Sequence, residues 1–309
     1  MASKQAPIHS GFGAHTEAHE VVGDVAGRIA IVTGGAAGIG LATTRALAEA
    51  GATVIVGARS SSSSVAGMPR VEVVALDLLD PASIDAFAGR FRASGRPLHM
   101  LIGNAGIMAK SLTRDARGYE VQFATNHLGH FQLAARLWPA LREANGARVV
   151  AVSSCGHRHG AVDFEDTMSE RRPYDPWLAY GMSKTANALF ALALDRRGEA
   201  HGVRAFSLHP GTIDTGLLSR AFGPELDELR ARLGPGGFKT PSQGAATSVW
   251  CASSAQLAGM GGVYCEDCDI AAPVADPELA YGVKPWAMDP EAAERLWGAS
   301  ERWTVPFTV

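Results

Sequence analysis

The chain has 309 residues, of which 47% are hydrophobic and 19% charged, so it can bury a sizeable core and is not typical of a disordered protein. Its formal net charge of -3 excludes a basic field that would hold nucleic acid or an anionic membrane surface. No apolar run reaches membrane-spanning length, and the N-terminal stretch MASKQAPIHSGFGAHTEAHE has no signal-peptide core, so we expect a cytoplasmic protein.

Residues 1–27 are predicted to form an N-terminal arm, and a single domain is predicted to span residues 28–309. Within that domain, apolar runs of strand length alternate with longer patterns of helical periodicity. Strands are predicted, in chain order, at residues 28–35, 53–58, 71–77, 98–106, 147–154 and 203–211. Helices are predicted at residues 38–51, 81–94, 117–143 (with a late kink at Pro139), 179–200 and 290–301.

The predicted strands are nearly continuous in Val, Ile, Leu and Ala, which is typical of strands buried on both faces. Strand–helix–strand repetition indicates parallel pairing with right-handed crossovers. The fold class is therefore α/β: a Rossmann-type, doubly wound parallel sheet flanked by helices, with ligands beyond the carboxyl ends of its strands. Residues 216–240 are polar, amphipathic and bounded by Gly and Pro, and we predict that they form a small helical lid over the substrate.

A glycine-rich segment, VTGGAAGIG, joins the first predicted strand to the first predicted helix. Gly34, Gly38 and Gly40 allow a tight turn and let backbone N–H groups approach a pyrophosphate at the helix N-terminus. The commoner Gly-x-Gly-x-x-Gly spacing does not fit, because Thr43 occupies its third position. A bare tight turn is the alternative, but the position between strand and helix favours a dinucleotide-binding site.

The segment after the second predicted strand indicates which dinucleotide is bound. No Asp or Glu occurs from Ala50 to Val71, so the usual carboxylate partner of an NAD ribose is missing. Arg59 and the serine run that starts at Ser60 can instead hold a 2′-phosphate. We therefore predict NADP(H) rather than NAD(H); the alternative is that Arg59 is an ordinary solvated loop residue.

A phenol and an ammonium lie one helical turn apart in YGMSK, at Tyr180 and Lys184. A free tyrosine, with a pKa of about 10, is a poor acid or base at neutral pH. Lowering that pKa by about three units requires roughly 4 kcal/mol of differential stabilisation of the phenolate. A neighbouring ammonium and the positive charge of an oxidised nicotinamide are suitable sources, and we expect Lys184 to supply part of the effect.

Several motifs occur in the order found in one enzyme family: TGGAAGIG, NAG at residues 104–106, Asn126, Ser154 and YGMSK. Together they resemble the Tyr-x-x-x-Lys branch of the short-chain dehydrogenase/reductases, over about residues 28–216. NHLGHF, SSCGHRHG and HPG are similar to the bacterial relatives of retinol dehydrogenases and WW-domain oxidoreductases. The resemblance implies an NADP(H)-dependent oxidoreductase that reduces a ketone or aldehyde, or oxidises the corresponding alcohol. One departure is Gly103, where the family often has a second Asn.

The resemblance also assigns roles. Tyr180 exchanges a proton with the substrate oxygen, Lys184 holds the nicotinamide ribose and lowers the tyrosine pKa, and Ser154 hydrogen-bonds the substrate oxygen. Asn126 helps to anchor a water that leads protons to Lys184. The resemblance implies the following cofactor-binding residues: Gly34, Ala36, Gly38, Ile39, Gly40, Arg59, Ser60, Asp77, Leu78, Asn104, Ala105, Gly106, Tyr180, Lys184, Pro210, Gly211, Ile213 and Thr215.

Each of these residues has a simpler explanation when it is taken alone. A Tyr-x-x-x-Lys pair is common on helix faces, Ser154 could end a strand, and Asp77 could form a turn or cap a helix. Their joint occurrence at predicted strand ends favours an enzyme. Two other functions stay open: a C=C reductase of the same family, and a catalytically idle dinucleotide-binding regulator.

The substrate side is less defined. The long insertion at residues 155–179 is predicted to wall the pocket, and His157, His159, Trp177 and Leu217 are candidate substrate contacts, although such histidines are more often solvated. Relatives often pair as dimers or tetramers. Cys265 and Cys268 form a CEDC motif, but no second ligand pair follows, so no metal site is predicted.

Overall fold

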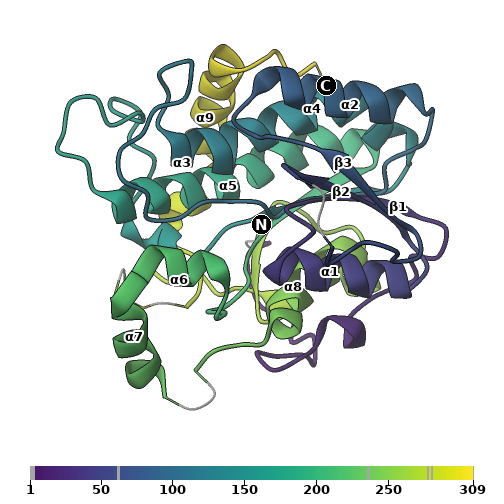
Figure 1. Ribbon diagram of the computed structural model, residues 1–309, viewed down its shortest axis with the longest axis horizontal. Helices are drawn as coiled ribbons and strands as arrows, with labels where there is room; N and C mark the ends of the chain where they lie inside the picture. Colours follow the sequence, from purple (N-terminus) through teal and green to yellow (C-terminus); the bar gives the residue numbers. More distant parts are fainter. Residues whose placement is uncertain (1–3, 61–62, 235–236, 277, 280, 309) are drawn as a thin grey trace.

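The computed structural model describes residues 4–60, 63–234, 237–276, 278–279 and 281–308, and it places one sheet between two layers of helices (Figure 1). Within these residues the sheet has eight strands in the order β3-β2-β1-β4-β5-β6-β7-β8, all parallel except for the last pair. The strands are β1 (Ile29–Thr33), β2 (Thr53–Ala58), β3 (Val71–Ala75), β4 (Met100–Gly103), β5 (Ala147–Val152), β6 (Val203–His209), β7 (Val263–Glu266) and β8 (Asp269–Ile270). The predicted doubly wound α/β fold is confirmed.

Two hydrophobic cores cover the two faces of the sheet. On one face lie α1 (Gly38–Glu49) and α8 (Pro241–Ser253), which pack on each other. On the other lie α2 (Pro81–Ala93), α4 (Gly129–Glu143), α5 (Pro176–Gly198) and α9 (Pro290–Trp303). Strand order reverses between β1 and β4, where Ile31 is opposite both Ile55 and Leu101, and this switch point is where such sheets bind ligands.

Three of the long helices begin in the same way. Asp80, Asp175 and Asp289 each precede a proline and accept a hydrogen bond from a backbone N–H in the first turn of α2, α5 and α9. Proline is suited to the first helical position because its missing N–H would be unpaired there. The Asp-Pro pairs therefore determine where these helices start.

The structure corrects several predicted elements. The helix predicted from residue 117 begins at α3 (Val121–Phe123), because the Glu120 carboxylate caps it, and it reaches α4 through a π-turn at Ala124–Leu128. β7, β8 and α8 were not predicted. Burial on both faces is wrong for β3, the edge strand, where Val73 is 38% exposed.

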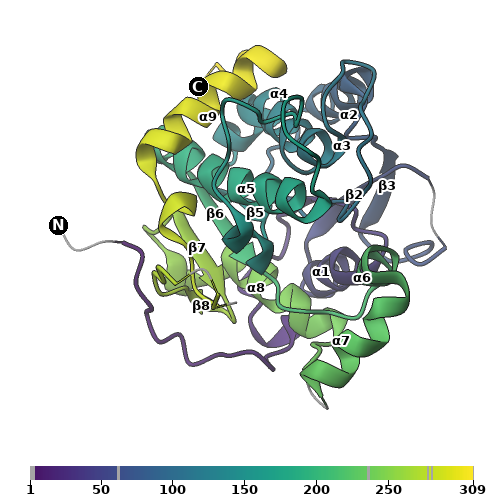
Figure 2. The same ribbon diagram turned by 90° about the vertical axis from the view of Figure 1, so that its left-hand side faces the viewer.

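The described part of the predicted N-terminal arm, residues 4–27, lies against β7, β8 and α8 (Figure 2). The Gln5 side chain donates to the carbonyls of Tyr264 and Ala271 at 2.8 and 2.6 Å and accepts from the Tyr264 amide at 2.8 Å. Val21 and Val25 are buried in the core beneath α1 and α8. These contacts attach the arm to the far edge of the sheet.

The predicted lid region contains two α-helices, α6 (Gly216–Phe222) and α7 (Leu226–Leu233), while its described residues 237–240 are not helical. Residues 235–236 of this region and residues 61–62 of the serine run lie outside the described residues. No helix among the described residues is long and apolar enough to span a bilayer.

A buried ion pair holds the end of α5 against β6. The Asp195 carboxylate, in a residue that is 3% exposed, accepts two hydrogen bonds of 2.8 Å from Arg204 and one of 3.0 Å from the Ala205 amide. Asp195→Ala is expected to lower the free energy of unfolding by about 3 kcal/mol, because it removes one partner of a buried pair.

Urea denaturation of the two proteins measures this difference. The matched control is Arg96→Ala, which breaks the exposed pair with Glu72 and should cost less than about 1 kcal/mol. Equal losses in the two variants would contradict the assignment of Asp195 as a buried anchor.

Candidate active site

The carboxyl ends of β1, β4, β5 and β6 meet the N-terminal half of α5, and the predicted site residues gather there. The glycine-rich segment follows β1, residues 104–106 follow β4, Ser154 follows β5 and Pro210 follows β6. Parallel strands bring these segments to one edge of the sheet, as the sequence predicts.

The glycine-rich segment forms a cradle at the N-terminus of α1. Gly34 and Gly38 have φ angles of +65° and +52°, in the left-handed region that favours glycine. A Cβ on Gly40 would lie 2.3 Å from the Gly34 carbonyl oxygen, so no side chain fits there. The residue before the helix is Ala37, which cannot cap the first N–H groups with its side chain. Open N–H groups beside a cradle of glycines fit a phosphate group.

The segment after β6 lies next to this cradle. The Thr215 Cγ2 atom would be 3.5 Å from a Cβ placed on Gly38, and buried Ile213 packs on Gly244 and lies near Ile39. Gly211 has a φ of +98° and lies against Lys239. The structure therefore brings together the predicted segments at residues 34–40 and 210–215.

The residues predicted to select the dinucleotide lie at the ends of β2 and β3. Arg59 and Ser60 are exposed. The Asp77 carboxylate accepts from the Leu79 amide at 3.0 Å, while Asp80 caps α2, so Asp77 forms a turn rather than a helix cap. Leu78 is buried.

Ser154, Tyr180 and Lys184 come together as predicted. The Ser154 hydroxyl accepts a hydrogen bond from the Gly156 amide at 3.1 Å, and the Ser154 side chain lies close enough to the Tyr180 phenol to lower its pKa. Lys184 Nζ donates to the Val152 carbonyl at 3.0 Å and lies 5.6 Å from the centre of the Tyr180 ring. A Cβ on Gly156 would lie 2.8 Å from the Tyr180 ring, so this glycine, which the sequence analysis did not select, gives the ring its place.

Burial shifts the pKa values of both groups of the pair. Burial raises the pKa of Tyr180 above its ordinary value of about 10, and the Ser154 hydrogen bond only partly opposes this rise. Burial also lowers the pKa of Lys184 to about 8. In the ligand-free protein, burial therefore keeps the phenol protonated at neutral pH, so that it can donate a proton. The expectation that Lys184 and an oxidised nicotinamide together lower the tyrosine pKa stays a prediction for the cofactor-bound protein.

Asn126 lies in the π-turn, and its side chain has three protein partners. Its Oδ1 accepts from the Ile107 amide at 2.9 Å, and its Nδ2 donates to the Ile107 carbonyl and to Ser183 Oγ at 3.0 and 2.9 Å. Ser183 Oγ donates in turn to the Tyr180 carbonyl at 2.7 Å. The side chain of Asn126 therefore ties the segment after β4 to the helix that carries Tyr180, and Ser183, within YGMSK, is a further member of the site.

The four candidate substrate residues lie in different environments. His157 is 1% exposed, donates through Nδ1 to the Ser154 carbonyl at 2.7 Å and accepts through Nε2 from the Lys284 amide at 3.1 Å, so a substrate contact is wrong for this residue. His159 is exposed. The Trp177 ring lies 4.9 Å from that of Phe222 in α6, the helix that also carries Leu217.

The CEDC cysteines are buried and carry free thiols. Among the residues that the structure describes, no group of three or more His, Cys, Asp or Glu side chains could hold a metal ion.

Comparisons with known proteins agree with this geometry. The family model for short chain dehydrogenases matches residues 28–225. The chain is 48% identical over 291 residues to a "Probable oxidoreductase" of Streptomyces lividans, covering 89% of this chain and 96% of the relative. It is 38% identical to retinol dehydrogenase 12 of Mus musculus, covering 89% of this chain and 86% of the relative, which confirms the resemblance to that group.

A solved structure, the RhlG/NADP active-site complex of Pseudomonas aeruginosa, superposes with a TM-score of 0.63 at 25% identity, covering 78% of this chain and 94% of that chain.

The raised pKa of Tyr180 gives a direct test in the ligand-free protein. No tyrosinate absorbance from this residue should form below about pH 10, because burial disfavours the phenolate. A spectroscopic pH titration of the wild type, with the titration of Tyr180→Phe subtracted, isolates this one phenol. A difference step with a midpoint near pH 7 would show that the protein alone acidifies Tyr180.

Proposed function

The chain belongs to the short-chain dehydrogenase family, and we propose that it is an NADP(H)-dependent oxidoreductase acting on a ketone or aldehyde, or on the corresponding alcohol. One observation carries this proposal: the buried phenol of Tyr180 lies beside the Ser154 side chain, with the Lys184 ammonium 5.6 Å from its ring centre on the same helix face. That arrangement suits proton delivery to an oxygen atom bound between the two hydroxyl groups.

Each side chain has a separate task in the reductive direction. Tyr180 donates its hydroxyl proton to the substrate oxygen as that oxygen gains negative charge. Ser154 donates a hydrogen bond to the same oxygen and orients it. The nearby ammonium of Lys184 then favours the phenolate that remains on Tyr180. When bound, the reduced dinucleotide supplies the hydride for the carbonyl carbon.

The residues along the cleft suit the dinucleotide. The cradle of Gly34, Gly38 and Gly40 would hold its pyrophosphate, and Lys184 would hold the nicotinamide ribose. Exposed Arg59, with Ser60, would take a 2′-phosphate. The likeness to a structure titled as an NADP complex supports the same choice.

Replacing Tyr180 with Phe tests the proton transfer. We expect turnover to fall by at least about 100-fold, since general acid catalysis contributes about that much, while NADPH binding changes only a few-fold. Ketone-dependent NADPH oxidation measures turnover, and NADPH fluorescence measures binding. Wild-type activity in Tyr180→Phe would show that Tyr180 does not transfer the proton. If the wild-type enzyme instead reduces a C=C bond of its substrate, the protein is a C=C reductase and the carbonyl assignment fails.

Arg59→Asp tests the choice of dinucleotide. The ratio of kcat/KM for NADPH to that for NADH is expected to fall by about 10- to 100-fold, because a charge-assisted phosphate contact is replaced by repulsion. The control is Arg92→Asp, an equal charge change at an exposed position of α2. An unchanged ratio in Arg59→Asp, or an equal change in both variants, would exclude Arg59 from the cofactor site.

A further inference from the structure

We propose that His130 is a positioning residue of this active site: a neutral imidazole with its proton on Nδ1 ties the end of β1 to the Asn126 peptide, and so supports Tyr180 and Lys184. The effect on turnover rests on the proposed function, but the tautomer and the contacts do not.

The ring of His130 lies between two fixed groups of different chemistry. Its Nδ1 is 3.0 Å from the main-chain oxygen of Asn126, and its Nε2 is 2.8 Å from Thr33 Oγ1 at the end of β1. His130 is 8% exposed and lies in the first turn of α4, directly after the π-turn. Both ring nitrogens are therefore held by the protein.

The partners determine the tautomer. A carbonyl oxygen only accepts, so Nδ1 carries the proton and donates it to Asn126. Thr33 Oγ1 already accepts from the amides of Asn104 and Ala105, each at 3.0 Å, which occupies its two lone pairs. Its own proton has two acceptors within reach, Nε2 at 2.8 Å and the Ile102 carbonyl at 3.4 Å, and the shorter contact is the one to Nε2, which is unprotonated in this tautomer.

The hydrogen bonds of Thr33 also disfavour the charged form of the His130 ring. A proton on Nε2 would face a hydroxyl oxygen that has no lone pair left for it. Burial lowers the pKa of His130 to about 4, and the nearby positive charge of Lys184 acts in the same direction. His127 is the other titratable group that interacts with the ring, and burial keeps it neutral as well. The ring is a fixed, uncharged connector.

His130 links two parts of the proposed site. Through Thr33 it holds the Asn104 and Ala105 amides, which follow β4 and line the predicted cofactor site. His130 also binds the main-chain oxygen of Asn126, and so fixes the residue whose side-chain amide binds Ile107 and Ser183. The Ser183 hydroxyl in turn donates to the Tyr180 carbonyl. A continuous set of hydrogen bonds therefore runs from β1 to the helix of Tyr180 and Lys184.

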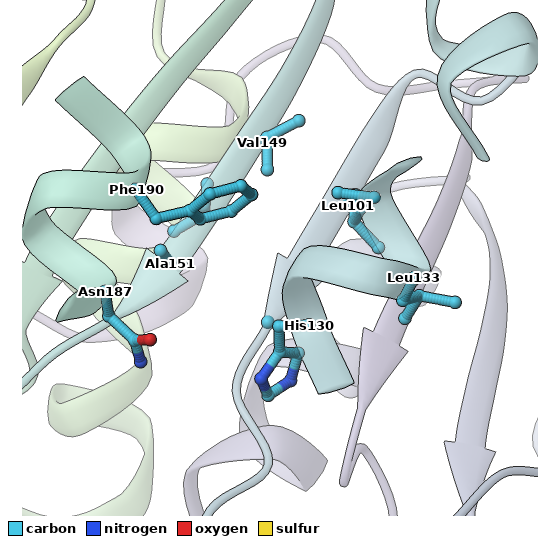
Figure 3. Close-up of a pocket in the computed structure, with 10 residues that line it drawn as sticks. Leu101, His130, Leu133, Val149, Ala151, Asn187 and Phe190 are labelled. Atoms are coloured by element: carbon cyan, nitrogen blue, oxygen red, sulfur yellow. The ribbon is translucent and has the colours of Figure 1, made fainter. Parts of the chain in front are cut away.

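Room for the ring comes from Gly103. A Cβ at this position would lie 3.1 Å from His130 Cδ2, closer than most packed contacts. The His130 ring lines a small pocket of about 10 Å³. Figure 3 shows Asn187 from α5 across this pocket from the ring, with apolar side chains from β4 and β5 around it. Gly103, where the family often has an Asn, thus leaves room for the His130 ring against β4.

The first test measures the tautomer in the wild-type, ligand-free protein. Long-range ¹H–¹⁵N spectra of histidine-labelled protein, with the His130 signals identified by their loss in His130→Gln, report which nitrogen carries the proton. The expected result is a neutral ring with Nδ1–H from pH 8 down to about pH 5. A proton on Nε2, or titration near pH 6.5, overturns the proposal.

The second test uses two variants that each keep one half of the ring's contacts. Asn places an amide donor near the position of Nδ1, and Gln places an amide oxygen near the position of Nε2. His130→Asn keeps the bond to Asn126, and the freed Thr33 hydroxyl has the Ile102 carbonyl 3.4 Å away as a substitute acceptor. His130→Gln keeps the Thr33 bond and loses the bond to Asn126.

We expect kcat to fall by about 10- to 100-fold in His130→Gln, since a small misplacement of catalytic groups can cost that much, and by less than about threefold in His130→Asn. NADPH Kd should stay within a few-fold in His130→Gln, because the segment after β4 keeps its contact with Thr33. Equal losses of kcat in both variants, or a loss confined to NADPH binding, overturn the proposal.

Hydrogen exchange separates this proposal from the proposed function. The Ile107 amide, which donates to Asn126 Oδ1, should exchange faster in His130→Gln than in His130→Asn. If the wild type reduces no carbonyl, the proposed function fails while the exchange and tautomer results still decide the role of His130. If neither variant folds, the wild-type tautomer decides it.

Discussion

Burial of a phenol and an ammonium on one face of α5 determines the chemistry that this site can support. Tyr180 and Lys184 are 6% and 4% exposed, and burial disfavours the charged form of both groups. The phenol is therefore neutral, while the ammonium, with a pKa of about 8, is still mostly charged at neutral pH. The protein alone presents a proton donor beside a cation. Because burial raises the pKa of Tyr180, formation of the phenolate requires stabilisation beyond what the protein alone supplies.

The site residues can come together only if chain segments approach closely at the strand ends, and glycine allows this approach at several positions. Gly40 lets α1 approach the end of β1, and Gly156 accommodates the Tyr180 ring. A Cβ on Gly106 would lie 3.1 Å from Asn126 Oδ1 and 3.5 Å from Lys184 Nζ, so the segment after β4 passes directly over both groups. Small residues at the strand ends thus allow the glycine-rich segment, the side-chain amide of Asn126 and the Lys184 ammonium to lie close together at one edge of the sheet.

Much of this arrangement could be predicted from the sequence, because it follows from local rules. The apolar runs at β1, β2 and β5, the helix starts at Pro81 and Pro290 and the order of the motifs are local features, and β2 has the predicted bounds. The predicted start of the Tyr180 helix at residue 179 was wrong, because Asp175 caps α5 and the helix begins at Pro176. The π-turn was missed because it depends on contacts between Asn126 and Ile107, which are distant in sequence. Strands β7 and β8 were missed because they are short and lack a helix between them.

The pKa of Tyr180 and the place of His157 could not be predicted for a related reason. The spacing of YGMSK places two groups on one helix face, but it gives neither their burial nor the carbonyl to which Lys184 points. His157 lies in a segment whose polar sequence predicts an exposed loop. The segment around Lys284 covers it, and that segment is more than 100 residues away in the sequence. The pKa of Tyr180 and the burial of His157 both depend on the surrounding side chains in the folded protein, which the residue types alone do not give.

The segment after β6 connects the glycine-rich segment to the predicted lid. Thr215 lies against Gly38 of the cradle and immediately precedes α6. Asp214, one residue earlier, accepts from Arg230 of α7 at 2.6 Å, and Phe222 at the end of α6 contacts Trp177 at the start of α5. Residues 210–215 therefore contact the glycine-rich segment and lead directly into α6 and α7. Packing contacts thus connect the glycine-rich segment, the predicted lid helices and the start of the helix that carries Tyr180.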